Sequence, residues 1–129
     1  YLRSLPDAGL GAVTGFHIIE HLPFEQLILL LDETQRVLRP GGVAIFETPN
    51  PQNVLVGSCN FYMDPTHRNP LPSEAMKFFA EARGFCNVSI LNLNPVPDAS
   101  QISGPGLSRN LTDLFNGPQD YAIICYKHD

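Results

Sequence analysis

The chain contains 129 residues, which is enough for one domain with a buried core. Its net charge of −5 argues against nucleic acid as the main partner, because phosphate backbones are bound by basic surfaces. No apolar run is long enough to span a membrane, and no signal-peptide pattern is present. The three cysteines are an odd number without the spacing of a metal site, which favours free thiols in a reducing cytoplasm over a disulfide framework: Cys59, Cys86 and Cys125.

Residues 11–50 carry the clearest pattern, which predicts a strand, a helix and a second strand. Two apolar runs, at 12–19 and 43–48, have the length of buried strands. They lack strict alternation, as expected for parallel strands that are covered on both faces. Between them, a helix is predicted to begin near Pro23 and to end at the Pro-Gly-Gly of residues 40–42. Its apolar face has residues three or four positions apart: Leu27, Leu30, Leu31, Thr34 and Leu38.

The chain after Asn50 has fewer regular signals, and its second half is rich in proline and glycine. Turn-forming residues and apolar spacing still divide it into further elements. They are predicted in this order: a short helix around 53–57, a helix from Ser73 as N-cap to Gly84, a strand at 85–93, a short helix at 107–115, and a last strand at 121–126.

Polar residues follow both strands of the first unit. His17, Glu20 and His21 come at the end of the first strand, and residues 48–50 end the second. In open α/β sheets, ligands bind at the carboxyl ends of the strands. If the strand–helix–strand prediction holds, both polar groups face the same side of the sheet.

Three spaced motifs in this region resemble class I S-adenosylmethionine-dependent methyltransferases. They read FHIIEHLP at 16–23, RVLRPGG at 36–42 and ETPN at 47–50. In that family the EHL segment follows the fourth strand, and RVLRPGG joins the next helix to the fifth strand. The continuation, with Asp-Pro-Thr-His-Arg at 64–68, resembles bacterial members that are found near or fused to polysaccharide-assembly enzymes.

The resemblance implies an α/β fold, the C-terminal part of a Rossmann-like methyltransferase sheet. About four strands with flanking helices are expected, in the local order fourth, fifth, seventh, sixth, with the last strand antiparallel. The family's Gly-rich cofactor loop and its acidic ribose-binding residue have no counterpart in this sequence. We therefore expect residues 1–129 to be the C-terminal portion of a single methyltransferase domain, without its cofactor-loop half and inactive alone.

A missing upstream half would leave the first strand as an exposed apolar edge of the sheet. Such edges pair with other chains, so a homo-oligomer through this edge is expected. A rearranged N-terminus that covers the edge would be the other outcome.

The resemblance also suggests roles for particular residues. Phe16, His17 and Ile18 would line the methionine end of S-adenosylmethionine. Some methyltransferases with a related Glu-His motif and a later histidine bind a divalent metal that orients acceptor hydroxyls. The corresponding residues here are His17, Glu20, His21 and His67. Three imidazoles and one carboxylate would suit Zn²⁺ or another transition ion better than Mg²⁺.

A general base is a second prediction for the acceptor side. Asp64 beside His67 could tune an imidazole that deprotonates a hydroxyl, with His21 as a further catalytic candidate. Structural alternatives remain open for each group. Glu20 and His21 could bond backbone groups and cap the following helix, and Asp64 and His67 could only stabilise their loop. Residues 48–51 are interpreted as a turn in a pocket wall.

The predicted function is transfer of a methyl group from S-adenosylmethionine to an oxygen of a small molecule or saccharide. A non-catalytic α/β interaction module, or a pseudo-methyltransferase, is the alternative. A metal-dependent hydrolase that uses the histidines is a third option, but it leaves RVLRPGG and the strand pattern unexplained.

Overall fold

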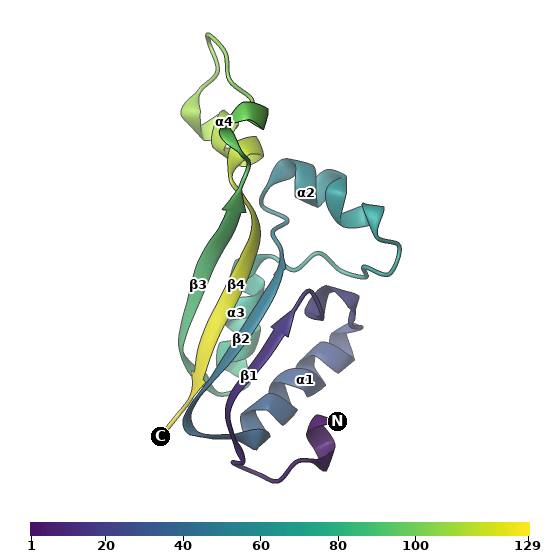
Figure 1. Ribbon diagram of the computed structural model, residues 1–129, viewed down its shortest axis with the longest axis vertical. Coiled ribbons are helices and arrows are strands. Elements are labelled where there is room, and N and C mark those ends of the chain that lie inside the picture. Colours follow the sequence, from purple (N-terminus) through teal and green to yellow (C-terminus); the bar gives the residue numbers. More distant parts are fainter.

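A computed structural model describes residues 1–129 as one mixed sheet with flanking helices (Figure 1). The sheet contains β1 (Leu10–Phe16), β2 (Leu38–Pro49), β3 (Phe85–Pro95) and β4 (Pro118–Lys127), in the order β1-β2-β4-β3. β1 and β2 are parallel, whereas β4 is antiparallel to both β2 and β3. The predicted fold class, strand order and antiparallel last strand are therefore confirmed.

The crossover helix α1 (Phe24–Val37) joins the two parallel strands. The predicted helix end at residues 40–42 is wrong, because the helix ends at Val37 and β2 begins at Leu38. A residue before proline is disfavoured in the α conformation, so the chain becomes extended before Pro40. Gly41 then adopts a left-handed φ of 71°. It lies in the part of β2 where the pairing register with β1 shifts.

The first strand is shorter than the predicted range of 12–19, because it ends at Phe16. His17 has a φ of 51°, a left-handed conformation that turns the chain away from the strand direction. A short 3₁₀ segment (Ile19–His21) follows and buries both Ile19 and Glu20. The turn therefore carries Glu20 into the interior at the carboxyl end of β1.

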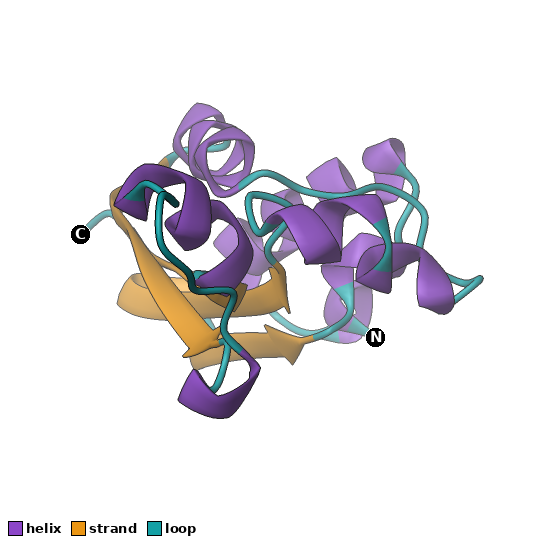
Figure 2. Cartoon of the chain, turned by 90° about the horizontal axis from the view of Figure 1, so that it is seen from above, coloured by secondary structure: helices purple, strands orange, loops and turns teal.

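The hydrophobic core lies between the sheet and the helices α1 and α3 (Ser73–Ala82), with the helices gathered mostly on one side of the sheet in Figure 2. Ser73 is not the N-cap that the sequence predicts. Pro72 occupies that position, and Ser73 is the first helical residue. The principal core residues are contributed by both helices and the two central strands: Leu27, Leu31, Phe46, Met76, Ala80, Tyr121 and Ile123.

Tyr121 connects the central strand β4 to the loop before α3 by a hydrogen bond. Its phenol is fully buried and donates a hydrogen bond of 2.7 Å to the carbonyl oxygen of Leu71. Burial raises the pKa of Tyr121, with a smaller contribution from the nearby Glu20 carboxylate. The phenol therefore remains a hydrogen-bond donor at physiological pH.

Two further helices lie beyond the carboxyl end of β2. α2 (Val54–Ser58) begins at Asn53, whose side chain accepts hydrogen bonds from the N–H groups of Leu55 and Val56. α4 (Arg109–Asn116) lies in the long connection between β3 and β4, which projects past the sheet in Figure 1. No helix has both the length and the apolar character that crossing a membrane requires.

All three cysteines are free thiols. Burial in the core raises the pKa of Cys125 to about 12, so this thiol stays protonated and unreactive.

Candidate functional site

The polar groups that follow β1 and β2 meet at one edge of the sheet, as the sequence predicts. The Thr48 hydroxyl donates a hydrogen bond of 3.0 Å to Oε2 of Glu20. His17 lies between two carboxylates, with Nδ1 3.3 Å from Glu20 Oε1 and Nε2 3.3 Å from Glu47 Oε1. These contacts connect the turn after β1 to the last residues of β2.

A distant loop completes the site. The backbone N–H of Arg68 donates to the carbonyl oxygen of Glu20 at 2.8 Å, which brings His67 next to the turn after β1. Nε2 of His67 lies 4.0 Å from Glu20 Oε1, and Nε2 of His21 lies 3.9 Å from the same atom. The centroids of the two imidazole rings are 4.7 Å apart.

Oε1 of Glu20 is buried and has no hydrogen-bond partner. The carboxylate is fully shielded from solvent, and only its other oxygen receives a hydrogen bond, from Thr48. A buried carboxylate oxygen normally has a donor or a cation beside it, because an unpaired one carries a desolvation cost. Nδ1 of His17 lies 3.3 Å away but forms no hydrogen bond with this atom, so Oε1 can still take a hydrogen-bond donor or a cation.

The surrounding hydrogen bonds assign the tautomers of the two histidines. The Thr66 hydroxyl proton goes to Asp64 Oδ1 at 2.6 Å, so Thr66 accepts its second bond, 2.9 Å long, from Nδ1–H of His21. Nδ1 of His67 lies 2.6 Å from the carbonyl oxygen of Phe61 and must donate to it. In the neutral state, both histidines thus keep an Nε2 lone pair free on the side of Glu20.

The site can hold a metal ion by its geometry. Glu20, His21 and His67 can each place one ligand atom within 4.8 Å of the other two. Nitrogen and carboxylate ligands in this combination suit a transition ion such as Zn²⁺. Of the predicted four ligands, His17 is outside this group, and its imidazole bridges Glu20 and Glu47.

The predicted dyad of Asp64 and His67 forms a charge contact without a hydrogen bond. Their closest atoms, Oδ2 and Nε2, are 3.7 Å apart. Hydrogen bonds from the hydroxyl and the N–H of Thr66 lower the pKa of Asp64, and the charges of His67 and His21 add to this effect. Asp64 therefore remains ionised beside both imidazoles.

The residues predicted to contact the cofactor, Phe16, His17 and Ile18, are exposed at the carboxyl end of β1. Phe16 and Ile18 expose 56% and 47% of their surfaces, although both are large apolar residues. Two features of the site were not predicted from the sequence: the contact of Glu47 with His17, and the hydrogen bond that Thr48 donates to Glu20. Both residues lie at the end of a strand that was predicted to neighbour the first one. Because ligands bind at the carboxyl ends of such strands, this position was the signal in the sequence that could have identified them.

The chain is similar to known methyltransferases in sequence and in fold. No model of a known protein family matches the sequence. A protein from Mycolicibacterium smegmatis, named a probable S-adenosylmethionine-dependent methyltransferase, is 37% identical over 81 residues, which are 63% of this chain and 30% of that protein. A SAM-dependent methyltransferase structure from Archaeoglobus fulgidus has a TM-score of 0.81 and 34% identity, over 98% of this chain and 63% of that one.

The resemblance to class I S-adenosylmethionine-dependent methyltransferases is confirmed. A more distant methyltransferase match shares the fold. It is a chain from the complex between the Haloferax volcanii Trm112 methyltransferase activator and a methyltransferase, with a TM-score of 0.71 and 12% identity over 98% of this chain and 57% of that one. The present chain thus spans less than two thirds of each of these methyltransferase-related chains.

Replacing Asp64 by asparagine should destabilise the protein at neutral pH but not in strong acid. The folded state lowers the pKa of this carboxyl below its ordinary value of 3.8, so its contribution is complete above that value. The contribution is lost as the pH falls through the lower folded-state pKa. Urea unfolding at a series of pH values measures the difference between wild type and Asp64→Asn.

Asp129→Asn is the matched control, because this C-terminal carboxylate makes no side-chain hydrogen bond comparable to that of Asp64. A difference between wild type and Asp64→Asn that stays constant down to strongly acidic pH would contradict the assigned hydrogen bonds.

Proposed function

We propose that these 129 residues form the acceptor-side, C-terminal portion of an S-adenosylmethionine-dependent methyltransferase. The methyl acceptor would be an oxygen of a small molecule or a saccharide. The observation that carries this proposal is the buried, unpaired Oε1 of Glu20, which faces the Nε2 atoms of His21 and His67. An acceptor hydroxyl placed between them would supply the missing donor.

The reaction follows from this placement. An oxygen lone pair of the acceptor attacks the methyl carbon, a C–O bond forms, and the C–S bond breaks with its electrons passing to sulfur. The products are the methyl ether and S-adenosylhomocysteine, and the hydroxyl proton is released. Alignment of the nucleophile with the methyl group is the main requirement of such a displacement.

The residues divide these tasks among themselves. Nε2 of His67 or His21 would accept the hydrogen bond of the acceptor hydroxyl and take its proton, and Glu20 Oε1 would stabilise the imidazolium that results. Asp64 is 3.7 Å from His67 and would favour the resulting imidazolium. Phe16, His17 and Ile18, at the open end of β1, would border the methionine part of the cofactor.

The Gly-rich cofactor loop would be supplied by a segment outside these 129 residues. The match to 98% of this chain but only 63% of the Archaeoglobus fulgidus methyltransferase supports this part of the proposal.

The free thiols are compatible with the proposed reducing cytoplasm.

Calorimetric titration with S-adenosylhomocysteine tests the methyltransferase proposal. The 129-residue chain should bind no cofactor, because the loop that approaches the cofactor is missing from its sequence. A longer version of the polypeptide that includes an upstream Gly-rich loop should bind it and transfer a labelled methyl group to hydroxyl-bearing acceptors. Micromolar binding by the short chain would contradict the proposed division of the domain.

If neither version binds the cofactor, the non-catalytic α/β module becomes the better interpretation. Transfer to amines but not to hydroxyls by the longer version would instead overturn only the oxygen specificity.

A metal ion is a second candidate occupant of the same site. The convergence of Glu20 Oε1 with two imidazole lone pairs supports it, because all three atoms are acceptors with no donor between them. When bound, a divalent ion would polarise an acceptor hydroxyl and lower its pKa. The protein's own contribution would be to hold Glu20 through Thr48 and the imidazoles through Thr66 and Phe61.

Zinc titration by calorimetry should therefore show one site per chain. His67→Ala and Glu20→Gln should each weaken zinc binding by at least about tenfold, because each removes one of three ligands. His128→Ala is the matched control, since this histidine is exposed near the C-terminus. Equal zinc affinity in wild type and His67→Ala would exclude the metal proposal.

We further propose that the open edge of β1 mediates self-association. β1 is a terminal strand of the sheet, and the exposed Phe16 and Ile18 lie at its carboxyl end and just after it. Sedimentation velocity should therefore show a dimer or a larger species, and Phe16→Lys should shift it toward monomer by placing a charge at the edge. Phe78→Lys, at a similarly exposed aromatic residue of α3, should leave the oligomeric state unchanged. A wild-type chain that stays monomeric would contradict this proposal.

A further inference from the structure

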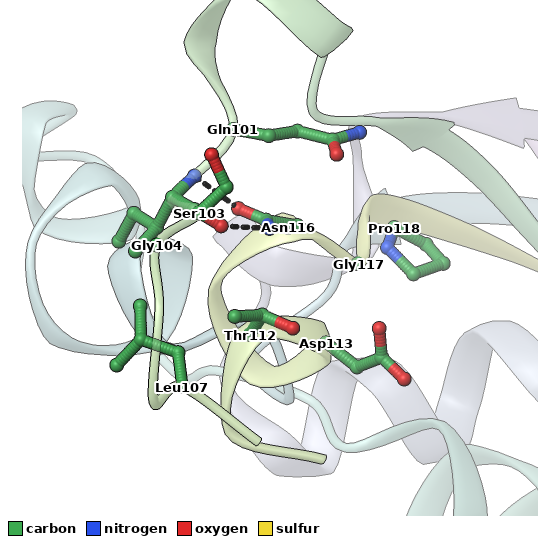
Figure 3. Close-up of a pocket in the computed structure, with 10 residues that line it drawn as sticks. Gln101, Ser103, Gly104, Leu107, Thr112, Asp113, Asn116, Gly117 and Pro118 are labelled. Carbon is green, nitrogen blue, oxygen red and sulfur yellow. Dashed lines mark hydrogen bonds between the residues drawn. The ribbon is translucent and has the colours of Figure 1, made fainter. Parts of the chain in front are cut away.

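A second polar cavity lies beside α4, at the far end of the connection between β3 and β4 (Figure 3). Its volume is about 620 Å³, within the range of small-molecule sites. The loop residues Gln101 and Ser103 lie on one side, and Thr112 and Asp113 of α4 lie on another, with Pro118 at the start of β4 completing the wall. Only two of its ten lining residues are hydrophobic, so the cavity is suited to a polar ligand.

Hydrogen bonds build the walls of this cavity. The Asn116 side chain accepts from the N–H of Ile102 and donates to its carbonyl oxygen, both at 2.8 Å. This pair of bonds joins the loop to the end of α4. From the other side, the buried Asn53 amide donates to the carbonyl oxygens of Phe115 and Gly117. Both ends of the cavity are thereby anchored to the rest of the fold.

Three exposed side chains of the lining keep polar atoms that have no hydrogen-bond partner in the chain. Gln101 uses its amide N–H₂ group on Val96 and Asp98, which leaves its Oε1 without a partner. The Ser103 hydroxyl makes no hydrogen bond within the chain, and Asp113 contacts only Arg109, at 3.9 Å. The available groups are therefore mainly acceptors, together with one hydroxyl that can donate or accept.

The charge and composition of the wall narrow the class of ligand. Asp113 is the one charged residue of the lining, and the exposed Arg109 guanidinium lies 3.9 Å from its carboxylate. No aromatic residue lines the cavity, so it lacks the ring faces that hold quaternary ammonium groups. A neutral ligand with several hydroxyl donors satisfies these groups best.

Two further cavities lie between the α4 cavity and the loop that carries His67. A neighbouring cavity of about 350 Å³ shares Asp113, Gly117 and Pro118 with it and extends to Asn50, directly after β2. A third cavity, of about 220 Å³, includes His67 together with Pro49 and Gln119, which adjoin Asn50 and Pro118 in the chain. The three cavities thus follow the paired ends of β2 and β4.

We propose that the α4 cavity is a binding subsite for a neutral saccharide unit of an extended acceptor. The reactive hydroxyl would lie at Glu20, and a sugar unit several residues along the acceptor would bind Gln101, Ser103 and Asp113. This inference rests on the proposed function for the identity of the reaction, but sugar binding to the cavity is independent of methyl transfer.

Amide NMR spectra of the 129-residue chain test the subsite directly. The probes are the neutral trisaccharides of glucose, mannose and galactose, each added without cofactor. At least one should shift the amide signals of residues 101–104 and 112–117. The double variant Gln101→Ala with Asp113→Ala should weaken that binding by about tenfold or more, because it removes two acceptors.

The matched control is Gln26→Ala with Asp129→Ala, which removes one amide and one carboxylate from exposed positions outside the cavity. This variant should bind the trisaccharide as wild type does. The amide spectra of both variants should stay well dispersed, which is the check that each variant remains folded. The proposal is overturned if no trisaccharide shifts these signals, if both variants bind equally, or if choline shifts them and the sugars do not.

Failure of this inference and failure of the proposed function are separable. Sugar binding at α4 without any methyl transfer by a longer version of the polypeptide would refute the reaction and keep the subsite. Methyl transfer to a short hydroxyl acceptor without sugar binding at α4 would keep the reaction and refute the subsite.

Discussion

Burial of the Glu20 carboxylate is the constraint on which the arrangement of the site depends. Removing a carboxylate from water is costly unless hydrogen bonds or charges replace its hydration. Thr48 supplies one hydrogen bond from the neighbouring strand, and the imidazole of His17 faces the other oxygen. These contacts require β1 and β2 to end at the same edge of the sheet, which their parallel pairing ensures.

Asparagine side chains organise the irregular parts of the chain around this edge. Asn50 donates to the carbonyl oxygen of Pro118, Asn53 caps α2 and reaches the end of α4, and Asn116 joins the loop at Ile102. An amide can donate and accept at once, so it can bridge backbone segments that form no strand or helix. The segment after β2 is thereby joined to the connection between β3 and β4.

Much of the fold and part of the site could be predicted from the sequence. The apolar runs and the helix spacing located the first unit, and the strand ends identified Glu20 and His21 as neighbours of residues 48–50. The helix end was misplaced because Pro40 and the glycines shape the start of β2 instead of stopping α1. Glu47 was missed because its contact with His17 depends on the left-handed turn after Phe16.

The sequence by itself determined the strand–helix–strand unit, the strand order implied by the family resemblance, and the residue types available at the strand ends. These features follow from local periodicity and from motifs at fixed spacing. Only the tertiary structure decided which atoms meet. The Thr48–Glu20 bond joins residues 28 positions apart, and the Thr66–His21 bond joins residues 45 apart. Such contacts depend on strand register and on the path of a loop, neither of which leaves a local pattern in the chain.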